Sequence, residues 1–174
     1  MGPRTSLLVF SAAGRRLALP LGEVRRVVPL PLLEKPAGAP AFLEGFFDFG
    51  GELISAVRLD RLLSLGEEPL GVYSPLLVLR RGDPPLALHV ASIESILDYG
   101  AADIQPIGRD ETFNACVVGR IAVRGETAYV LSAEEILLTE ERATLAAHRG
   151  MRKQRLAELA GTASLPATMR PRRN

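Results

Sequence analysis

The sequence predicts an all-β fold followed by a C-terminal helix, and three observations lead to this prediction. Apolar residues fall in many short runs interrupted by Gly and Pro, a pattern typical of β-barrels and β-sandwiches. The runs in the second half of the chain repeat those of the first half in the same order. After Ser132 the apolar spacing changes to that of a helix.

The composition is that of a folded protein. Hydrophobic residues make up 47% of the 174 residues and charged residues 24%, as in ordinary globular domains. Cys116 is the only cysteine, so an intrachain disulfide cannot form, and a reducing compartment is expected. The first apolar run, residues 6–10, is too short for a signal peptide, and no run reaches the ~18 residues of a membrane helix. We therefore expect a cytoplasmic protein without membrane insertion.

The first half of the chain is expected to consist almost entirely of strands. These strands are expected at residues 6–10, 16–19, 25–30, 45–49 and 52–59. Between the last two lie Gly50 and Gly51, and glycine reaches the positive φ angles of a tight hairpin without a Cβ clash. A helical turn is expected at residues 60–63, and a linker over residues 65–71.

The second half repeats this order of elements. Its strands are expected at residues 75–80, 86–90, 117–123 and 127–131. A shift of 69 places aligns the apolar residues 7–9 with 76–78, and a shift of 74 places Gly45 on Gly119. Two similar open β units would each leave sheet edges exposed. Pairing them side by side covers those edges and buries a shared seam.

The charges divide the chain into an acidic body and a basic end. Residues 1–141 hold 13 Lys and Arg and 19 Asp and Glu, whereas residues 142–174 hold 8 and 1. A basic segment can bind nucleic acid or an anionic membrane surface, can dock on an acidic protein, or can only solubilise the chain. No aromatic residue follows Tyr129, and proteins that bind single strands stack bases on aromatic rings. Nucleic-acid binding is therefore not expected.

The C-terminal helix is expected to begin directly after Ser132. With Ser132 as N-cap and Glu135 three residues later, two free backbone N–H groups would be satisfied. The helical pattern continues to about His148, weakens at Gly150 and is followed by a short amphipathic stretch over residues 151–160. The chain beyond Gly161 is rich in Pro, Thr and Arg and is expected to be disordered.

Catalytic and metal-binding interpretations have little support. Cys116 and His89 offer the residue types of a nucleophile and its base, but Cys116 is expected to be a small core residue and His89 to face solvent from a strand. His148 is expected to be exposed. Two histidines without ligand-spaced carboxylates do not predict a zinc site. We expect no enzymatic activity, no cofactor and no metal.

Four segments, taken in order, resemble the CheW-like domain. They are the opening strand Leu8-Val9-Phe10, Val24, the element at residues 40–45 and the stretch at residues 51–59. The order and spacing of these segments carry the resemblance more than any single match. It covers about residues 5–140.

The resemblance implies two intertwined five-stranded SH3-like β-barrels with short helices and a C-terminal helix. A CheW-like domain is expected over residues 1–141, with pseudo-repeated units at about 5–65 and 75–140 that exchange strands, and a basic helix and disordered tail over residues 142–174. The implied function is that of a non-catalytic adaptor in a bacterial chemosensory complex. Its implied partners are a chemoreceptor cytoplasmic tip and the regulatory domain of a CheA-like histidine kinase. One alternative is a small enzyme or ligand-binding barrel, which would need converging polar groups in the seam. The other is binding of nucleic acid or of an acidic partner through the basic tail.

Three segments depart from the pattern of the family where partner contacts are expected. Val-x-Glu-Ile becomes Val24-Arg25-Arg26-Val27, Asn-Leu-Arg-Gly becomes Asp48-Phe49-Gly50-Gly51, and Val-Asp-Leu becomes Val57-Arg58-Leu59. A reversed charge disfavours the old partner and implies a compensated one. The departures at Arg26 and Gly50 weaken the inference of a chemoreceptor partner, and we expect a divergent member of the family.

The segment Phe46-Phe47-Asp48-Phe49 is the strongest candidate for a contact surface. In a strand, Phe47 and Phe49 face one side and Phe46 and Asp48 the other. One interpretation is that one face fills a barrel and the other fills the seam, and the second is that one face lines a partner groove. The candidate partner-binding residues are Val24, Arg25, Arg26, Phe46, Phe47, Phe49, Gly50 and Arg58.

Overall fold

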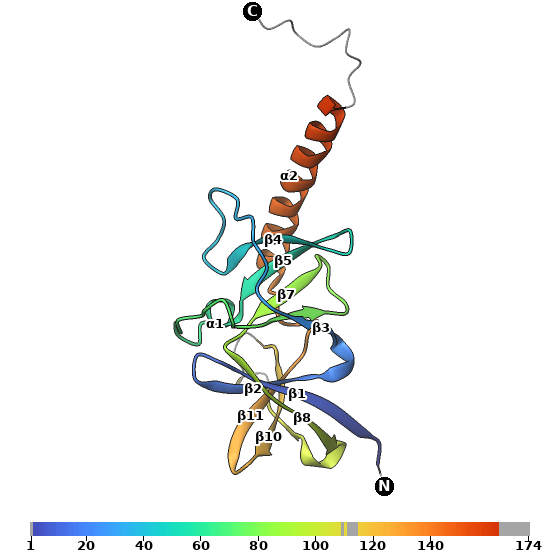
Figure 1. The fold of residues 1–174 in the computed structure, drawn as a ribbon. Helices are drawn as coiled ribbons and strands as arrows, with labels where there is room; N and C mark the ends of the chain where they lie inside the picture. The colour runs from blue at the N-terminus through green and yellow to red at the C-terminus, as the bar shows by residue number, and fades with distance from the viewer. Residues whose placement is uncertain (1, 109, 111–114, 164–174) are drawn as a thin grey trace, which may run out of the picture.

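The computed structural model (Figure 1) describes residues 2–108, 110 and 115–163, which form two β-sheets and one long helix. The strands are β1 (Arg4–Ala12), β2 (Arg15–Pro20), β3 (Val24–Val28), β4 (Leu43–Phe49), β5 (Glu52–Arg58), β6 (Leu76–Leu79), β7 (Leu86–His89), β8 (Ser92–Gly100), β9 (Gln105–Pro106), β10 (Val117–Val123) and β11 (Glu126–Leu131). The helical segments are η1 (Leu21–Glu23), α1 (Leu59–Leu62), η2 (Ala101–Asp103) and α2 (Thr139–Ala163). The prediction of an all-β fold with short helices and a C-terminal helix is confirmed.

Each sheet combines strands from both halves of the chain. The six-stranded sheet has the order β8-β1-β2-β11-β10-β9, and the five-stranded sheet has the order β3-β6-β7-β5-β4. The hairpins β1-β2 and β6-β7 are therefore each completed by strands of the other half. The shifts of the sequence repeat match β1, β2 and β3 to β6, β7 and β8, and β4 and β5 to β10 and β11. Under this match the two sheets have the same strand order, apart from the short β9.

Both sheets curl, so that a side chain of one edge strand reaches a strand on the other side of the same sheet. In the five-stranded sheet, the guanidinium carbon of Arg25 on edge strand β3 lies 5.1 Å from the ring centroid of Phe49 on edge strand β4. In the six-stranded sheet, the Tyr99 hydroxyl on β8 donates a hydrogen bond of 3.2 Å to the backbone oxygen of Ala122 on β10. Side chains thus bridge the open side of each sheet, as in a partly open barrel.

The buried side chains form three separate clusters rather than one. The core of the six-stranded sheet contains Leu7, Val9, Ala18, Ile121, Val123, Ala128 and Val130. The core of the five-stranded sheet contains Phe47, Ile54, Ala56, Leu76, Val78 and Ala87. A larger cluster, the seam core, includes Leu8, Phe10, Leu17, Leu19, Leu43, Phe46, Val57, Leu77 and Leu88. Because neighbouring residues of a strand point to opposite faces, Leu7 and Leu8 can serve two different cores.

Gly45 and Gly119, which the sequence repeat aligns, occupy equivalent crowded positions. Each lies where the register of its strand pair shifts at an irregularity. A Cβ on Gly45 would lie 2.8 Å from the backbone oxygen of Glu34, and one on Gly119 would lie 2.6 Å from Cγ2 of Ile104. Real Cβ atoms do not approach other atoms so closely. The repeated glycine therefore has a steric reason in both sheets.

The strand β8 was not expected from the sequence. The apolar residues Ile93, Ile96 and Leu97 do not show a period of two in the sequence. In the structure the burial of β8 does alternate: Ile93 and Leu97 lie on the partly buried face, whereas Ile96, 56% exposed, lies on the other face and obscures the pattern. The two-residue β9 is too short to have a recognisable pattern.

The start of the C-terminal helix was also predicted wrongly. The helix α2 begins at Thr139, and the chain around Ser132 to Leu138 turns instead, so that Ile136 and Leu137 enter the seam core. Ser132 is not an N-cap; its backbone oxygen accepts a turn hydrogen bond from Glu135. The cap is supplied further on, where Glu141 Oε2 accepts from the backbone N–H of Leu138 at 2.8 Å.

Gly150 does not interrupt the helix, which runs continuously to Ala163. A glycine in a helix interior costs roughly 1 kcal/mol relative to alanine, and the helix contacts the body both before Gly150, through Arg149, and after it, through Arg152. The disorder expected beyond Gly161 concerns mainly residues 164–174, which lie outside the described residues. Within the described part of the chain, no helix has the length and apolar character that crossing a membrane requires.

Candidate functional site

Four side chains form a cluster at the open side of the five-stranded sheet, here called the edge surface: the exposed Arg25 and Arg26 of β3, the half-buried Phe49 of β4 and Glu52 of β5. Arg25 Nη1 lies 2.8 Å from Glu52 Oε2. The guanidinium carbons of Arg25 and Arg26 lie 5.1 Å and 6.0 Å from the centroid of the Phe49 ring. Both guanidinium groups therefore lie near the ring of the same phenylalanine. A cation–π contact of this kind contributes roughly 0.5–1 kcal/mol at exposed sites.

The turn beside this cluster holds Phe49 and Glu52 in place. Gly50 and Gly51 adopt φ angles of +64° and +86°, which glycine reaches at low cost. The backbone N–H of Gly51 donates to Asp48 Oδ1 at 3.2 Å and closes the turn. Four of the predicted partner-binding residues, Arg25, Arg26, Phe49 and Gly50, thus come together here. Glu52, which sequence reasoning did not select, joins them only because the sheet curls.

Three other predicted partner-binding residues are buried under the surface. Val24 and Phe47 are each 7% exposed and Phe46 is 1% exposed. Phe46 and Val24 lie in the seam core, and Phe47 lies in the core of the five-stranded sheet, where Phe49 packs against it. Phe46 and Phe47, which point to opposite faces of β4, are thus both core residues, while Asp48 is exposed and Phe49 half-buried. The three buried side chains shape the surface from below and are not accessible on it.

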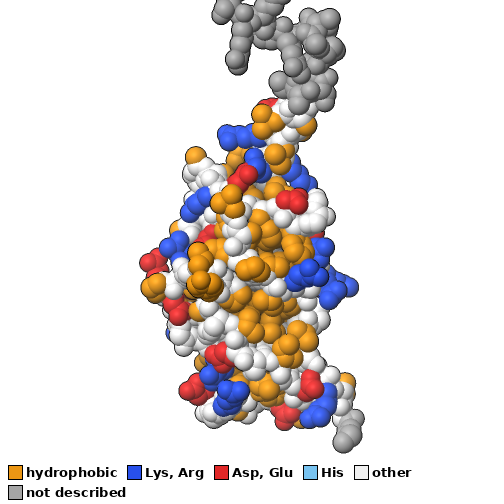
Figure 2. Space-filling model, in the orientation of Figure 1, with side chains coloured by type: hydrophobic (Ala, Val, Ile, Leu, Met, Phe, Trp, Pro, Cys, Tyr) orange, Lys and Arg blue, Asp and Glu red, His pale blue; other side chains and the backbone are white. Residues whose placement is uncertain are grey.

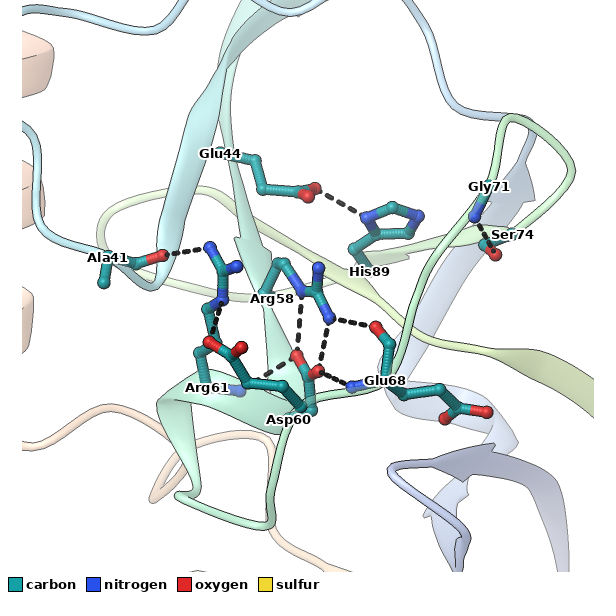
Figure 3. Close-up of polar contacts among 10 residues, drawn as sticks. Ala41, Glu44, Arg58, Asp60, Arg61, Glu68, Gly71, Ser74 and His89 are labelled. Carbon is teal, nitrogen blue, oxygen red and sulfur yellow. Dashed lines mark hydrogen bonds and ion pairs between the residues drawn. The ribbon is translucent and has the colours of Figure 1, made fainter.

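Arg58, the eighth predicted residue, is enclosed by its own chain (Figure 3). Its Nε donates to Asp60 Oδ1 at 3.0 Å and its Nη2 to the backbone oxygen of Glu68 at 2.6 Å, and Nη2 also pairs with Asp60 Oδ2. Asp60 further accepts the backbone N–H groups of Arg61 and Glu68. The positive charge that the Val57-Arg58-Leu59 departure introduces is therefore neutralised by Asp60 of the same chain.

The environment of this pair shifts the pKa of both groups. Burial alone would raise the pKa of Asp60, but the hydrogen bonds and charge of Arg58, together with the backbone N–H of Glu68, hold that pKa below its ordinary value. The hydrogen bond to Asp60 in turn raises the pKa of Arg58. Both groups are charged at neutral pH. The pair ties the end of β5 to the loop that follows α1.

The prediction that His89 faces solvent is wrong. The side chain is 2% exposed, and Nδ1 lies 2.6 Å from Glu44 Oε2, close to Arg58 (Figure 3). All four residues of β7 are buried, so side chains on both of its faces are covered by packing, and Glu44 of β4 lies against the imidazole ring. The alternation of apolar and polar residues within β7 does not reveal this burial. Nε2 has no hydrogen-bond partner among the described residues.

The remaining candidate residues have different environments. Cys116 is fully buried in the seam core, as predicted for a structural residue, and burial raises the pKa of its thiol to about 11. His148 is half-buried next to residues 34–37, and is not exposed as expected. Among the described residues, no three His, Cys, Asp or Glu side chains are placed together to hold a metal ion.

Comparison with known proteins gives two matches. The family model of the CheW-like domain matches residues 6–142 of the chain. The fold is similar to the crystal structure of the scaffolding protein TtCheW from Thermoanaerobacter tengcongensis, with a TM-score of 0.72, 18% sequence identity, and coverage of 81% of this chain and 92% of that chain. No curated protein matches the chain. At this identity the structural similarity is one of fold.

Proposed function

The chain belongs to the CheW-like domain family, and from this membership we propose that it is a non-catalytic scaffold of a chemosensory complex. In this role it couples chemoreceptors to a CheA-like histidine kinase through protein contacts, in the cytoplasm. The observation that carries the proposal within the family is the edge surface, where two arginines and one phenylalanine are presented together. Arginine and aromatic side chains are the residue types most enriched among interface hot spots.

The domain organisation is part of the same proposal. Residues 1–141 form the scaffold domain, with repeated units at about 5–65 and 75–140, and residues 142–174 form a separate basic arm. The equal strand orders of the two sheets support a duplicated unit. The family match, which ends at residue 142, supports the separation of the arm.

The edge surface favours an acidic partner group. Glu52 neutralises one of the two guanidinium groups, Arg25, through an ion pair whose side chains are 42% and 43% exposed. Among the described residues Arg26 has no such carboxylate, so its charge is available to a partner. Where relatives in the family carry glutamate, this chain carries Arg26, so the matching group on its partner should have changed from basic to acidic.

The proposal is tested by direct binding to purified partners from the same genome. The partners are the regulatory domain of a CheA-like kinase and the cytoplasmic tip of a chemoreceptor. We expect the kinase domain to bind, and Arg26→Glu to weaken this binding about tenfold, equivalent to ~1.4 kcal/mol. Arg124→Glu, an equally charged change at the exposed β10-β11 turn, should leave the affinity unchanged.

Two results would count against the scaffold. Absence of binding to both partners at roughly 100 µM would contradict the coupling function itself. If Arg26→Glu and Arg124→Glu weakened kinase binding equally, the coupling function would remain supported, but the edge surface would not be its binding site. The thermal unfolding of each variant shows whether its fold is intact.

A further inference from the structure

The helix α2 lies almost wholly beyond the part of the chain that matches the family, which ends at residue 142. Its first turns are anchored on the body. Leu145 is fully buried in the seam core. The guanidinium of Arg142 donates to the backbone oxygens of Asp83, at 3.2 Å, and Glu134, at 2.9 Å. These contacts fix the direction in which the helix leaves the domain.

The middle of the helix crosses the β4-β5 hairpin through two arginines. Arg149 Nε donates to the backbone oxygen of Leu53 at 3.1 Å, and Arg152 forms an ion pair with Glu34. Leu145, Arg149 and Arg152 are separated by four and three positions, so they lie along one face of the helix. This face is the one that packs on the body.

The same face continues past the edge of the body without a partner. Leu156 and Leu159 follow Arg152 at the same spacing of four and three positions, and they are 43% and 66% exposed. All described residues from 153 to 161 are exposed. Figure 1 shows this end of α2 projecting beyond both sheets. We call residues 153–163 the overhang.

The overhang and the chain after it are strongly basic. Within the described part of the chain, Lys153 and Arg155 form no ion pair with a carboxylate, and Glu158 is the one acidic residue after residue 142. The sequence beyond the helix adds Arg170, Arg172 and Arg173. Figure 2 shows apolar and cationic side chains together on the projecting part of the chain.

A groove lies beside the overhang, between α2 and the β4-β5 hairpin. It has a volume of about 570 Å³. Phe47, Leu53 and Leu156 supply apolar parts of its lining, and Arg149 and Lys153 supply cationic parts on the helix side. Asp48 and Glu52 lie on the hairpin side. An apolar side chain can therefore enter the groove while acidic groups beside it face the helix.

We propose that the overhang of α2 and this groove bind an acidic amphipathic helix of another protein. The apolar face of that helix meets Leu156 and Leu159, and its carboxylates meet Lys153 and Arg155. Charge complementarity selects this occupant: a second copy of α2 would bring like charges together. Two partly exposed leucines give little apolar area for membrane insertion, and the overhang carries no aromatic ring for stacking on bases. The proposal does not depend on the coupling function.

The probe is a fluorescently labelled 21-residue peptide, with leucine at helical spacing on one face and glutamate elsewhere, titrated with the full chain. We expect the double variant Lys153→Glu/Arg155→Glu to weaken binding by about tenfold or more. We expect Leu156→Ser/Leu159→Ser to weaken it as well. The control Arg4→Glu/Arg124→Glu makes the same charge change on exposed residues at the start of β1 and in the β10-β11 turn. Figure 1 shows these strands at the end of the molecule opposite to the free end of α2, and this variant should bind like the wild type. None of these side chains is buried, so the fold is retained, and circular dichroism verifies this.

Several outcomes would overturn the proposal. One is that Lys153→Glu/Arg155→Glu binds the acidic peptide as tightly as the wild type does. Another is that the wild type binds a peptide with glutamine in place of glutamate as tightly as it binds the acidic peptide. Tighter binding to phosphatidylserine-containing vesicles or to duplex DNA than to the peptide would assign the overhang to a membrane or to nucleic acid. A chain that is a dimer in solution, and that becomes a monomer with Lys153→Glu/Arg155→Glu, would assign it to a second copy.

Discussion

Arg25 and Glu52 form an ion pair of 2.8 Å although β6 and β7 lie between their strands in the sheet. The contact is possible only because the five-stranded sheet curls and brings β3 back toward the β4-β5 hairpin. Its energy is small, because exposed ion pairs contribute roughly 0–1 kcal/mol. Its importance is geometric, since it places two arginines and Phe49 on one surface.

Gly45 should not tolerate a side chain. In Gly45→Ala the new Cβ would lie 2.8 Å from the backbone oxygen of Glu34, so β4 or the adjacent segment must move, and we expect a loss of about 2–3 kcal/mol in the free energy of unfolding. Urea denaturation measures this loss. Gly50→Ala is the control, because no atom lies within 4 Å of its Cβ position, and its positive φ angle should cost only about 1 kcal/mol. Equal losses for the two variants would contradict the steric argument.

The pair of Arg58 and Asp60 should matter more than an exposed pair. Arg58→Met leaves the Asp60 carboxylate buried without its cation, and we expect a loss of about 3 kcal/mol in unfolding free energy. The double variant Arg58→Met/Asp60→Leu should recover part of this loss, because no charge remains buried. Arg61→Met removes a nearby but more exposed cation and should cost less than ~1 kcal/mol. A small effect of Arg58→Met would show that the pair does not organise the loop after α1.

The Asp60 carboxylate should make the chain sensitive to acid. Its pKa in the folded chain lies below the ordinary value of 3.8. The stability that it contributes is therefore fully present above that value and is lost as the pH falls through the folded value. We expect the difference in unfolding free energy between the wild type and Asp60→Asn to shrink as the pH falls below about 4. A difference for Asp60→Asn that stays constant over this pH range would contradict the prediction.

Cys116 should be unreactive in the folded chain. Burial raises its pKa to about 11, so at pH ~8 only about one thiol in a thousand would be ionised, and the thiolate is the nucleophile. Alkylation by iodoacetamide should be much slower in the native chain than in urea. A native rate close to the unfolded rate would show that this residue becomes accessible through local opening.

Local patterns in the sequence were sufficient for most strands. The expected strands at 45–49, 86–90, 117–123 and 127–131 agree with β4, β7, β10 and β11 to within two residues at each end. The aligned Gly45 and Gly119 proved to share a steric role. The expectations that failed, which include β8, the exposure of His89 and of His148, and the start of α2, have a common cause. Each depends on contacts between segments distant in the sequence: the pairing of β8 with β1, the packing on both faces of β7, the approach of residues 34–37 to His148, and the seam core that receives Ile136.

Apolar periodicity, turn glycines and the internal repeat were sufficient by themselves to predict a β-rich chain that repeats one order of strands and ends in a helix. These features act over a few residues, so the sequence displays them directly. Only the tertiary structure decided which charges are internal and which face outward. Arg58 is buried and paired with Asp60, whereas Arg25 and Arg26 lie exposed over Phe49. The physical reason is that the curl of a sheet and the exchange of strands depend on the packing of whole surfaces, which no local pattern encodes.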